Sequence, residues 1–374
     1  MIQNTRDHPQ RKSRWPQFSL RQLACTLVIC SIGFAIAGRI AADAKRVDLA
    51  IRALEDKGVH VARNEARVFG FAASDEFVCT WPLSFFGKST YRPVSYLVVP
   101  RGADESYAKV LPDIGSIDSI DIYTQIQSHQ LAFLARAKGV KQGTIECDFP
   151  QGTMDALISW KSLTELMIGD VQSANLVGIG KLGSLQAIYL RDIQGDMSDL
   201  VSELTQLPSL RQIDIESCAL DLCDAKSFES LKNVRSVRIN ACTGSSVACR
   251  GIGHLHSLKH LEIEGVDIDD SCLSDLGCLC PQLERIRIGS CKASPVRILQ
   301  FLSKCYALKE LYLTQESICA VECHQAVQSI GCCGSLETLR IEALDKPSAK
   351  RLSHILPRCG ITVTLKGREL YRLP

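Results

Sequence analysis

The sequence predicts an α/β solenoid, in which short parallel strands line a concave face and helices form the outer surface. Three observations predict this fold class. A motif of the form LxxLxL recurs along most of the chain, and the residues that follow each copy have apolar side chains at helical spacing. Aliphatic residues are plentiful while aromatic residues make up only 6% of the chain, which suits many small, similar core layers better than one bulky core.

The LxxLxL motif is best preserved between Leu163 and Ile341, where the first positions of eight copies are separated by 22 to 28 residues. The copies are SLTELMIG, SLQAIYLR, SLRQIDIE, NVRSVRIN, SLKHLEIE, QLERIRIG, ALKELYLT and SLETLRIE. A period of this size lies in the range of leucine-rich repeats, about 20 to 29 residues. Weaker copies have their first positions at Val94, Ile117, Val140 and Ile361. Residues 91–374 are therefore predicted to form one domain of about ten repeats.

The second half of each repeat is predicted to be helical. The clearest examples are HQLAFLARAKG, SDLVSELTQLP, PVRILQFLSKC and PSAKRLSHILP, which span residues 129–139, 198–208, 295–305 and 347–357. Their apolar residues recur at three- and four-residue intervals. A strand, a turn and a helix repeated with a right-handed connection give a right-handed, horseshoe-shaped solenoid, with the parallel sheet on its concave face and the helices outside.

The first 58 residues have a different character and are predicted to hold a membrane anchor. A basic tail, residues 1–22, precedes the uncharged run LACTLVICSIGFAIAG over residues 23–38. This run is about long enough for a transmembrane helix, and Arg39 beyond it could reach the membrane interface. Residues 39–58 are predicted to continue as a helical stalk, and residues 59–90, which are richer in Phe and Trp, to cap the first repeat.

The basic N-terminal flank favours a single-pass protein of the cell envelope. The N-terminus would be cytoplasmic and the repeats would lie outside, in the periplasm or at the cell surface. Arg39, Lys45 and Arg46 on the other flank weigh against this orientation. Two alternatives for the apolar run are a cleaved signal peptide, with AIA at residues 35–37 as the cleavage site, and a buried helix of a soluble protein.

Six of the 18 cysteines fall into two columns of the repeat, at positions +8 and −3 counted from its first leucine. Position +8 is filled by Val171, Ile193, Cys218, Cys242, Val266 and Cys291, and position −3 by Leu182, Leu207, Leu231, Leu255, Cys280, Cys305 and Cys333. A position that accepts either Cys or an aliphatic residue is a buried apolar slot, where a thiol behaves as a small hydrophobe. These cysteines are therefore predicted to be packing residues.

Other roles for the cysteines stay open at this point. Neighbours in one column lie within the Cα range of a disulfide, although parallel side chains keep their Cβ atoms apart. The pairs concerned are Cys218–Cys242 and Cys305–Cys333. In CAVECH, residues 319–324, two cysteines one helical turn apart could bind a metal, but no fourth ligand is identifiable. The alternative for this stretch is a plain insertion in a longer repeat.

The sequence predicts neither an enzyme nor a metal, cofactor or small-molecule site. GxGxxG, GxxxxGK[ST], GxSxG and HExxH are all absent, and the 8 histidines are scattered over different repeats. The net charge of +2 gives no whole-chain reason to expect nucleic acid, and acidic residues interrupt any basic strip that could follow a phosphate backbone. A protein is the expected partner.

Positions +2, +4 and +6 of each motif are predicted to point away from the core, onto the concave sheet. The partner-binding residues predicted there are Tyr189, Arg191, Asp214, Glu216, Arg238, His260, Glu262, Arg285, Arg287, Tyr312 and Arg340. Aromatic and Arg side chains are common energetic anchors of protein interfaces, so Arg285 and Arg287 are the first candidates for mutation. The alternative interpretation is a sheet face that is merely solvated.

The repeats resemble bacterial leucine-rich repeat proteins of the cysteine-containing type, the type that also follows F-box domains in eukaryotic ubiquitin-ligase adaptors. CPQLERIRIGSC is the best match, followed by LSKCYALKELYL. The N-terminus, WPQFSLRQLACTLVICSIGFAIAG followed by AIRALEDKGVHV, resembles the leader of membrane-anchored repeat proteins of planctomycete bacteria. Only three repeats keep Cys at position +8, and no F-box-like segment precedes the array, so the adaptor role does not carry over.

These resemblances imply an anchored, non-catalytic binding protein. The leading hypothesis is a membrane-anchored solenoid that binds another protein, or an envelope polymer, through its concave face. The alternatives are a structural envelope component that has no specific ligand and an intracellular adaptor of the ubiquitin-ligase type, which the leader disfavours.

Overall fold

The computed structural model divides the chain into two compact units. The first consists of residues 1–48 and 65–92, and the second of residues 49–64 and 93–374. The residues that the structure describes are 20–63, 67–68, 71–72, 94–101, 106, 109–110, 116–147, 150, 152–221, 223, 225–266, 268–289, 295–314, 333–342, 350, 354, 358–365 and 368–373.

The first unit holds most of a long helix and a short hairpin. Helix α1 runs over Leu20–Glu55, without a break at Arg39. Strands β2 (Arg67–Val68) and β3 (Phe71–Ala72) pair antiparallel. Over the part of the chain that the structure describes, no helix combines the length and the apolar character needed to cross a membrane. Residues 23–38 are thus helical as predicted, but this finding does not support their prediction as a transmembrane segment.

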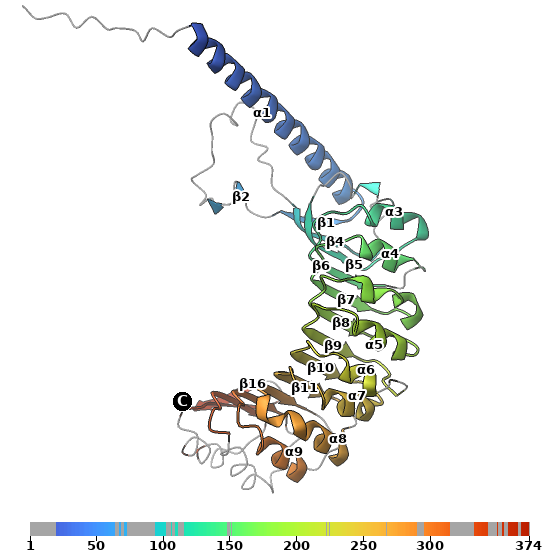
Figure 1. Cartoon of the computed structure of the whole chain (residues 1–374), viewed down its shortest axis with the longest axis vertical. Coiled ribbons are helices and arrows are strands. Elements are labelled where there is room, and N and C mark those ends of the chain that lie inside the picture. The colour runs from blue at the N-terminus through green and yellow to red at the C-terminus, as the bar shows by residue number, and fades with distance from the viewer. Residues whose placement is uncertain are drawn as a thin grey trace, which may run out of the picture. The chain divides into compact units, whose positions relative to one another are not determined.

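The second unit is built on one sheet of 14 strands (Figure 1). The strands are β1 (His60–Arg63), β4 (Val94–Val99), β5 (Ile117–Ile122), β6 (Gln142–Glu146), β7 (Glu165–Gly169), β8 (Ala187–Arg191), β9 (Gln212–Glu216), β10 (Ser236–Asn240), β11 (His260–Glu264), β12 (Arg285–Ile288), β13 (Glu310–Leu313), β14 (Thr338–Glu342), β15 (Gly360–Leu365) and β16 (Arg368–Leu373). Neighbouring strands between β4 and β15 are parallel, while β1 and β16 close the two edges in antiparallel orientation.

The helices of the second unit lie on one side of this sheet. Figure 1 shows the strands along the inner side of a curved array and the helices along its outer side. They are α3 (Leu131–Leu134), α4 (Thr153–Ile158), α5 (Ser198–Leu204), α6 (Ala225–Glu229), α7 (Ser245–Ile252), α8 (Asp270–Leu276) and α9 (Pro295–Leu302), with 3-10 turns η4 (Ser128–Gln130), η5 (Ser173–Leu176), η6 (Ile179–Lys181) and η7 (Gly277–Gln282). This is the predicted solenoid of the leucine-rich-repeat kind.

The repeat motif forms the core because its apolar positions stack in register. Leu261 pairs with Val237 on one side and with Ile286 on the other, so that equivalent residues of successive repeats lie next to each other. The eight first positions of the motif, from Leu163 to Leu336, are all at most 3% exposed. Adjacent layers therefore bury each other's aliphatic side chains, which is the main stabilising term in a fold of this kind.

The ends of the repeats depart from the sequence-based expectation. The helices are shorter than predicted: α5 ends at Leu204 and α9 at Leu302, and tight turns connect them to the next strand. Ile361 pairs with Leu339, the fourth residue of its motif. The prediction that Ile361 takes the first position of a repeat is therefore wrong by three residues, because the apolar alternation of ITVTL fits either register.

Gly143 occupies a core position where other repeats have Leu, Ile or Val. A Cβ atom at Gly143 would lie 3.3 Å from Cζ3 of Trp160, so the indole ring fills the space that the missing side chain leaves. Trp160 is 3% exposed, and its Nε1 donates a hydrogen bond to the carbonyl oxygen of Leu134 at 2.8 Å. The weak repeat that starts at Val140 is thus completed by a residue from the helical half of the layer.

The structure confirms packing roles for four of the six column cysteines. Cys218, Cys242, Cys305 and Cys333 are buried thiols, and the two disulfides left open by the sequence are not formed. The Sγ of Cys218 donates to the carbonyl oxygen of Glu216 at 3.2 Å, within its own turn. Burial raises the pKa of the Cys218 thiol to about 12, so it stays protonated at neutral pH. The side chains of Cys280 and Cys291, and residues 319–324, lie outside the described part.

Replacing Cys218 by Val tests the packing role. Because Val171 and Val266 fill the same column, we expect Cys218→Val to change the free energy of unfolding by less than about 1 kcal/mol. Cys218→Asp, which buries a carboxylate, should cost more than about 3 kcal/mol. Urea unfolding followed by circular dichroism measures both. A loss with Val as large as the loss with Asp would contradict the packing role.

Candidate interaction surface

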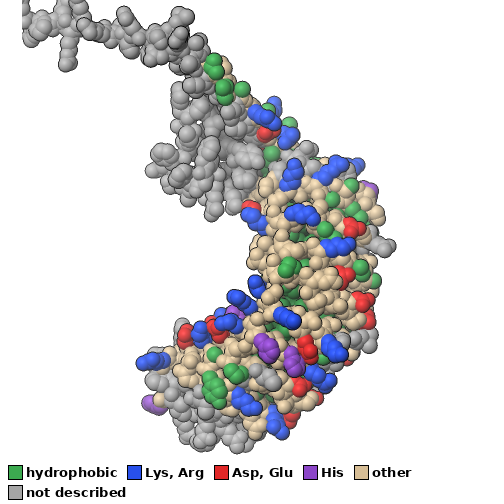
Figure 2. Space-filling view, in the orientation of Figure 1, with side chains coloured by type: hydrophobic (Ala, Val, Ile, Leu, Met, Phe, Trp, Pro, Cys, Tyr) green, Lys and Arg blue, Asp and Glu red, His purple; other side chains and the backbone are tan. Residues whose placement is uncertain are grey.

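The outward face of the sheet in the second unit carries the predicted partner-binding residues. In β9, β10 and β11, half-buried residues alternate with buried ones, and the half-buried ones are the residues at positions +2, +4 and +6. The register therefore places the predicted residues on one face, opposite the helices. Figure 2 shows Lys and Arg side chains next to Asp and Glu side chains along the inner margin of the unit. We call this surface the concave face.

Position +4 of four successive repeats forms a row of alternating charge on the concave face, which continues into Tyr312 of the fifth repeat. We call this row, from Asp214 to Tyr312, the charge ladder. Arg238 lies between two carboxylates: its Nη1 is 3.5 Å from Oδ2 of Asp214, and its Nε is 3.4 Å from Oε1 of Glu262. The same Oε1 atom is 3.2 Å from Nε of Arg287. The guanidinium carbon of Arg287 lies 4.5 Å from the centroid of the Tyr312 ring, a cation–π contact.

Further ion pairs connect the ladder to its flanks. Arg287 also contacts Glu264, with 2.8 Å between Nη2 and Oε2, and Arg285 contacts Glu310 at 2.7 Å. Both arginines that the sequence favoured as anchors for a partner are thus bound to carboxylates of their own chain. Arg340 continues row +4 and is exposed, with no ion pair among the described residues.

The centre of the ladder is buried without complete hydrogen bonding. Nε of Arg238, Oε1 of Glu262 and Nε of Arg287 are buried and have no hydrogen-bond partner among the described residues. Oε1 of Glu262 nevertheless lies only 3.4 Å from Nε of Arg238 and 3.2 Å from Nε of Arg287. The opposite charges attract one another, but the geometry does not allow aligned hydrogen bonds. Each member keeps an oppositely charged neighbour when another is removed, because Arg238 also contacts Asp214 and Arg287 also contacts Glu264.

The other end of the concave face is rich in tyrosine. Tyr96 donates a hydrogen bond to Oδ2 of Asp121, and this bond raises the pKa of Tyr96 to about 12. Burial raises the pKa of Tyr123, and the carboxylates of Asp121 and Glu146 raise it further. Tyr189 accepts a hydrogen bond of 3.1 Å from Gln212. The three phenols therefore remain protonated at neutral pH and can donate hydrogen bonds.

Arg191 crosses the concave face in the same region. Its Nη2 lies 2.6 Å from Oε2 of Glu146, two strands away, and the residue between them in row +6 is Gly169. Because Gly169 has no side chain, the guanidinium group can pass over it. The predicted site residues Arg191 and Glu216 thus lie at the +6 edge of the face, with Tyr189 and Asp214 in row +4.

His260 lies on the concave face next to Arg285. Burial lowers the pKa of His260, and the positive charge of Arg285 lowers it further, so the imidazole is neutral at pH 7. Within the described ranges, no group of three or more His, Cys, Asp or Glu side chains is arranged to hold a metal ion.

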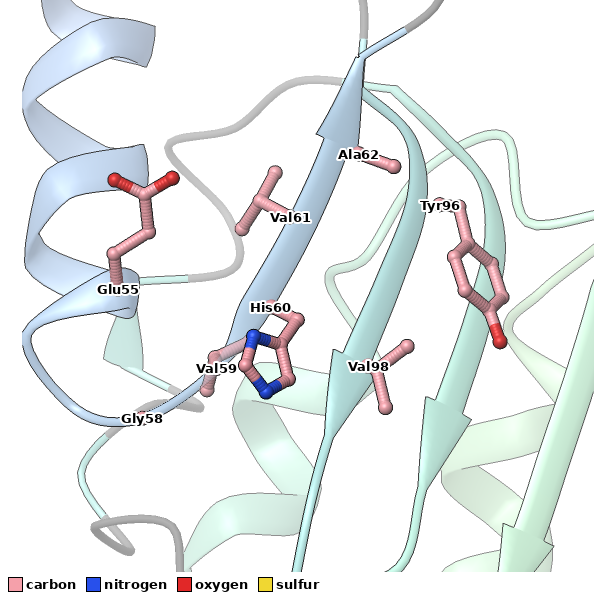
Figure 3. Close-up of a pocket in the computed structure, with 8 residues that line it drawn as sticks. All are labelled: Glu55, Gly58, Val59, His60, Val61, Ala62, Tyr96 and Val98. Atoms are coloured by element: carbon pink, nitrogen blue, oxygen red, sulfur yellow. The ribbon is translucent and has the colours of Figure 1, made fainter.

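One hollow opens at the N-terminal edge of the sheet, around the end of α1 and strands β1 and β4 (Figure 3). It is lined by Glu55, Gly58, Val59, His60, Val61, Ala62, Tyr96 and Val98. The titratable side chains in this lining, Glu55, His60 and Tyr96, do not converge on one point in Figure 3. The hollow therefore offers no pairing of a nucleophile with a base.

The list of partner-binding residues predicted from the sequence omits several residues that lie on the concave face in the structure. Asp121, Tyr123, Glu146 and Glu165 lie on the same outward face as the predicted residues. The same counting of positions +2, +4 and +6 assigns them to it. A sum of charges over successive repeats would have found them, because acidic residues concentrate in these strands.

Comparison with known proteins does not identify the chain. No family model matches the chain, and no curated protein matches it. Among solved structures, the chain is similar to an internalin from Listeria monocytogenes, with 16% sequence identity and a TM-score of 0.43. The match covers 75% of this chain and 91% of the internalin. A likeness at this level does not bear on what the chain binds.

The first residue of the charge ladder gives a test by pH. Burial raises the pKa of Asp214 to about 6, with Glu262 and Glu216 adding to the rise and Arg238 opposing it. Such a carboxyl group has a higher pKa in the folded state than in the unfolded state, so its ionisation destabilises the fold. This destabilisation is complete above the folded pKa and disappears as the pH falls through that value and the group becomes protonated. We expect Asp214→Asn to be more stable than the wild type at pH 7.5 by about 1 kcal/mol, with solvent screening allowed for. The difference should approach zero at pH 4.

Glu284 supplies a control of opposite sign. Lys259 and Lys309 lower its pKa to about 2 through hydrogen bonds, so its charge stabilises the fold at neutral pH. Glu284→Gln should therefore lose stability at pH 7.5, or leave it unchanged, and should not gain it. Thermal unfolding at several pH values measures both variants. Asp214→Asn being less stable than the wild type at pH 7.5 would contradict the assignment.

Proposed function

We propose that this chain is a non-catalytic binding protein that recognises another protein through the concave face. The observation that carries the proposal is the concave face with its charge ladder, in which neighbouring side chains from Asp214 to Tyr312 contact one another, and with Tyr189 beside it. Arg and Tyr are typical anchors of protein interfaces. Side chains that are already fixed lose little conformational entropy when a partner binds, which favours recognition by such a surface.

We further propose that the chain is membrane-anchored through residues 23–38, with the N-terminus in the cytoplasm and the repeats outside. The support is the uncharged sequence, the leader that resembles those of anchored planctomycete repeat proteins, and the apolar side chains exposed on α1. Val28, Ile32 and Phe34 are 58%, 55% and 66% exposed. Large apolar side chains exposed on one helix favour contact with lipid or with another apolar surface.

Site-specific crosslinking tests the binding proposal. A photoreactive phenylalanine analogue replaces Tyr189 on the concave face, and in a second variant replaces Val177, which is 64% exposed and lies between η5 and η6. We expect illumination of intact cells to give a discrete crosslinked product from position 189 and none of the same mass from position 177. Identical product patterns from both positions would contradict recognition through the concave face.

The identity of the crosslinked product separates the proposal from the structural alternative. Mass spectrometry of a product formed with a different protein supports a binding function. A product that contains only a second copy of this chain would favour self-association in the envelope.

Cell fractionation tests the anchor. We expect the full chain to sediment with membranes and to resist extraction by high salt, because apolar contact with lipid does not depend on ionic strength. A variant with Ile32 and Phe34 replaced by Asp should move to the supernatant, since charges inside a bilayer are unfavourable. Protease added to cells whose inner membrane is intact should digest the repeats. Digestion only after rupture of the inner membrane would contradict the proposed orientation.

A further inference from the structure

The two ends of the concave face differ in charge. On β5 to β9, the outward positions carry five carboxylates and one Arg, so their net charge is −4. These residues are Asp121, Glu146, Glu165, Asp214, Glu216 and Arg191. On β10 to β14, the outward positions carry four Arg and four Glu, which balance: Arg238, Arg285, Arg287, Arg340, Glu262, Glu264, Glu310 and Glu342. We call the outward surface of β5 to β9 the acidic half.

Neutral donors, rather than cations, satisfy several carboxylates of the acidic half. Glu165 accepts a hydrogen bond of 2.9 Å from the side-chain amide of Gln142, and Glu216 accepts one of 3.3 Å from that of Asn240. Asp121 accepts from the hydroxyl group of Tyr96. These bonds fix the direction of each carboxylate but leave its charge in place. Two other carboxylates of the acidic half, Glu146 and Asp214, contact an Arg, as Glu262, Glu264 and Glu310 do in the other half.

The carboxylates of the acidic half raise the pKa of two nearby tyrosines. Besides burial, the carboxylates of Glu165 and Asp214 raise the pKa of Tyr189, and those of Asp121 and Glu146 raise the pKa of Tyr123. Two phenols on different strands thus lie in a negative potential from different acids. A phenol ring in such a field presents a π-face that attracts cations as well as a hydroxyl group that can donate.

We propose that the acidic half binds a Lys- and Arg-rich segment of the partner protein, laid across strands β5 to β9. This proposal rests on the proposed function and names the class of partner. Strands lie about 4.8 Å apart, and alternate side chains of an extended peptide lie about 7 Å apart, so successive basic side chains can reach carboxylates on successive or alternate strands. Each contact would be a charge-assisted hydrogen bond or a cation–π contact, with Tyr123 and Tyr189 between the acids.

Charge complementarity decides between this occupant and others. A polynucleotide or an acidic peptide would bring negative charge to a surface that already has an excess of it. The chain's own basic tail, residues 1–22, also has the required chemistry, since it holds five Lys and Arg residues and one Asp. The experiment must therefore distinguish binding of the tail from binding of a partner protein.

The test uses the full chain in detergent and two fluorescent ten-residue peptides of Gly and Ser, one with five Lys or Arg residues and one with five Glu residues. Fluorescence anisotropy in about 0.15 M salt should show binding of the basic peptide and none of the acidic peptide. Glu165→Gln with Glu216→Gln should raise the Kd of the basic peptide at least about tenfold, since two charged contacts are removed.

A matched control removes two charges from the helical side of the solenoid. Asp155→Asn with Asp199→Asn, in the first turns of α4 and α5, changes the net charge equally and should change the Kd less than about twofold. Equal loss of affinity in both double variants would overturn the proposal in favour of unspecific attraction. Thermal unfolding checks that the variants are folded. A salt titration of the wild-type chain needs no variant and is therefore a second, independent test. A Kd for the basic peptide that does not rise with salt concentration would also overturn the proposal.

Two further results would separate a failure of the proposed partner class from a failure of the proposed binding function. If replacing the tail residues Arg6, Arg11, Lys12 and Arg14 by Gln strengthens peptide binding at least about tenfold, the tail occupies the acidic half and the proposed partner is wrong. If position 189 crosslinks to a different protein while the basic peptide does not bind, the binding function stands and only the class of partner is overturned.

Discussion

The register of the parallel strands is the constraint on which the rest of the second unit depends. In every repeat the fourth and sixth residues of LxxLxL face the core, and they pair with the same positions of the neighbouring repeat. The turn that follows preserves this alignment. Asp170, Asp192, Ser217 and Ala241 take the same position after their strands, all with φ between 51° and 59°. Each donates its N–H to a carbonyl oxygen of the next repeat, at 2.9 to 3.1 Å. This bond holds non-glycine residues in a left-handed conformation that costs about 1 to 2 kcal/mol.

A fixed register also determines the chemistry of the outer face. Residues at equal positions of successive repeats lie one strand spacing apart, so a change of residue type along the chain becomes a row of side chains across the sheet. Opposite charges in one row, as from Asp214 to Arg287, neutralise each other. Where residues of like charge occupy neighbouring positions, the surface keeps a net charge. The difference between the two ends of the concave face follows from which residues occupy these rows and not from any change in the backbone.

The fold was predictable because the repeat signal is redundant, whereas the site depends on single contacts. Eight clear motifs determine the strands and the buried columns, even where one copy is weak. Trp160 could not be assigned to the gap at Gly143, since it comes from the helical half of the layer. Arg285 and Arg287 lie on the concave face, as the spacing predicted, but the spacing does not predict their ion-pair partners. Arg285 forms an ion pair with Glu310 on the following strand, while Arg287 forms ion pairs with Glu262 and Glu264 on the preceding strand. The register fixes which residues are neighbours, and side-chain geometry decides which neighbours pair.

This division of the face has a consequence for binding energetics. A partner that engaged the charge ladder would have to replace ion pairs that already exist, and the net gain from exchanging one ion pair for another is small. Tyr312 and the exposed Arg340 can still contribute there through packing. In the acidic half, Glu165 and Glu216 are half-buried and hydrogen-bonded to neutral amide groups, whereas Asp121 is buried. A cation that reaches Glu165 or Glu216 therefore adds attraction without replacing an Arg. If the chain binds a basic segment as proposed, the ladder would mainly hold the sheet face rigid, and the electrostatic part of the affinity would come from the acidic half.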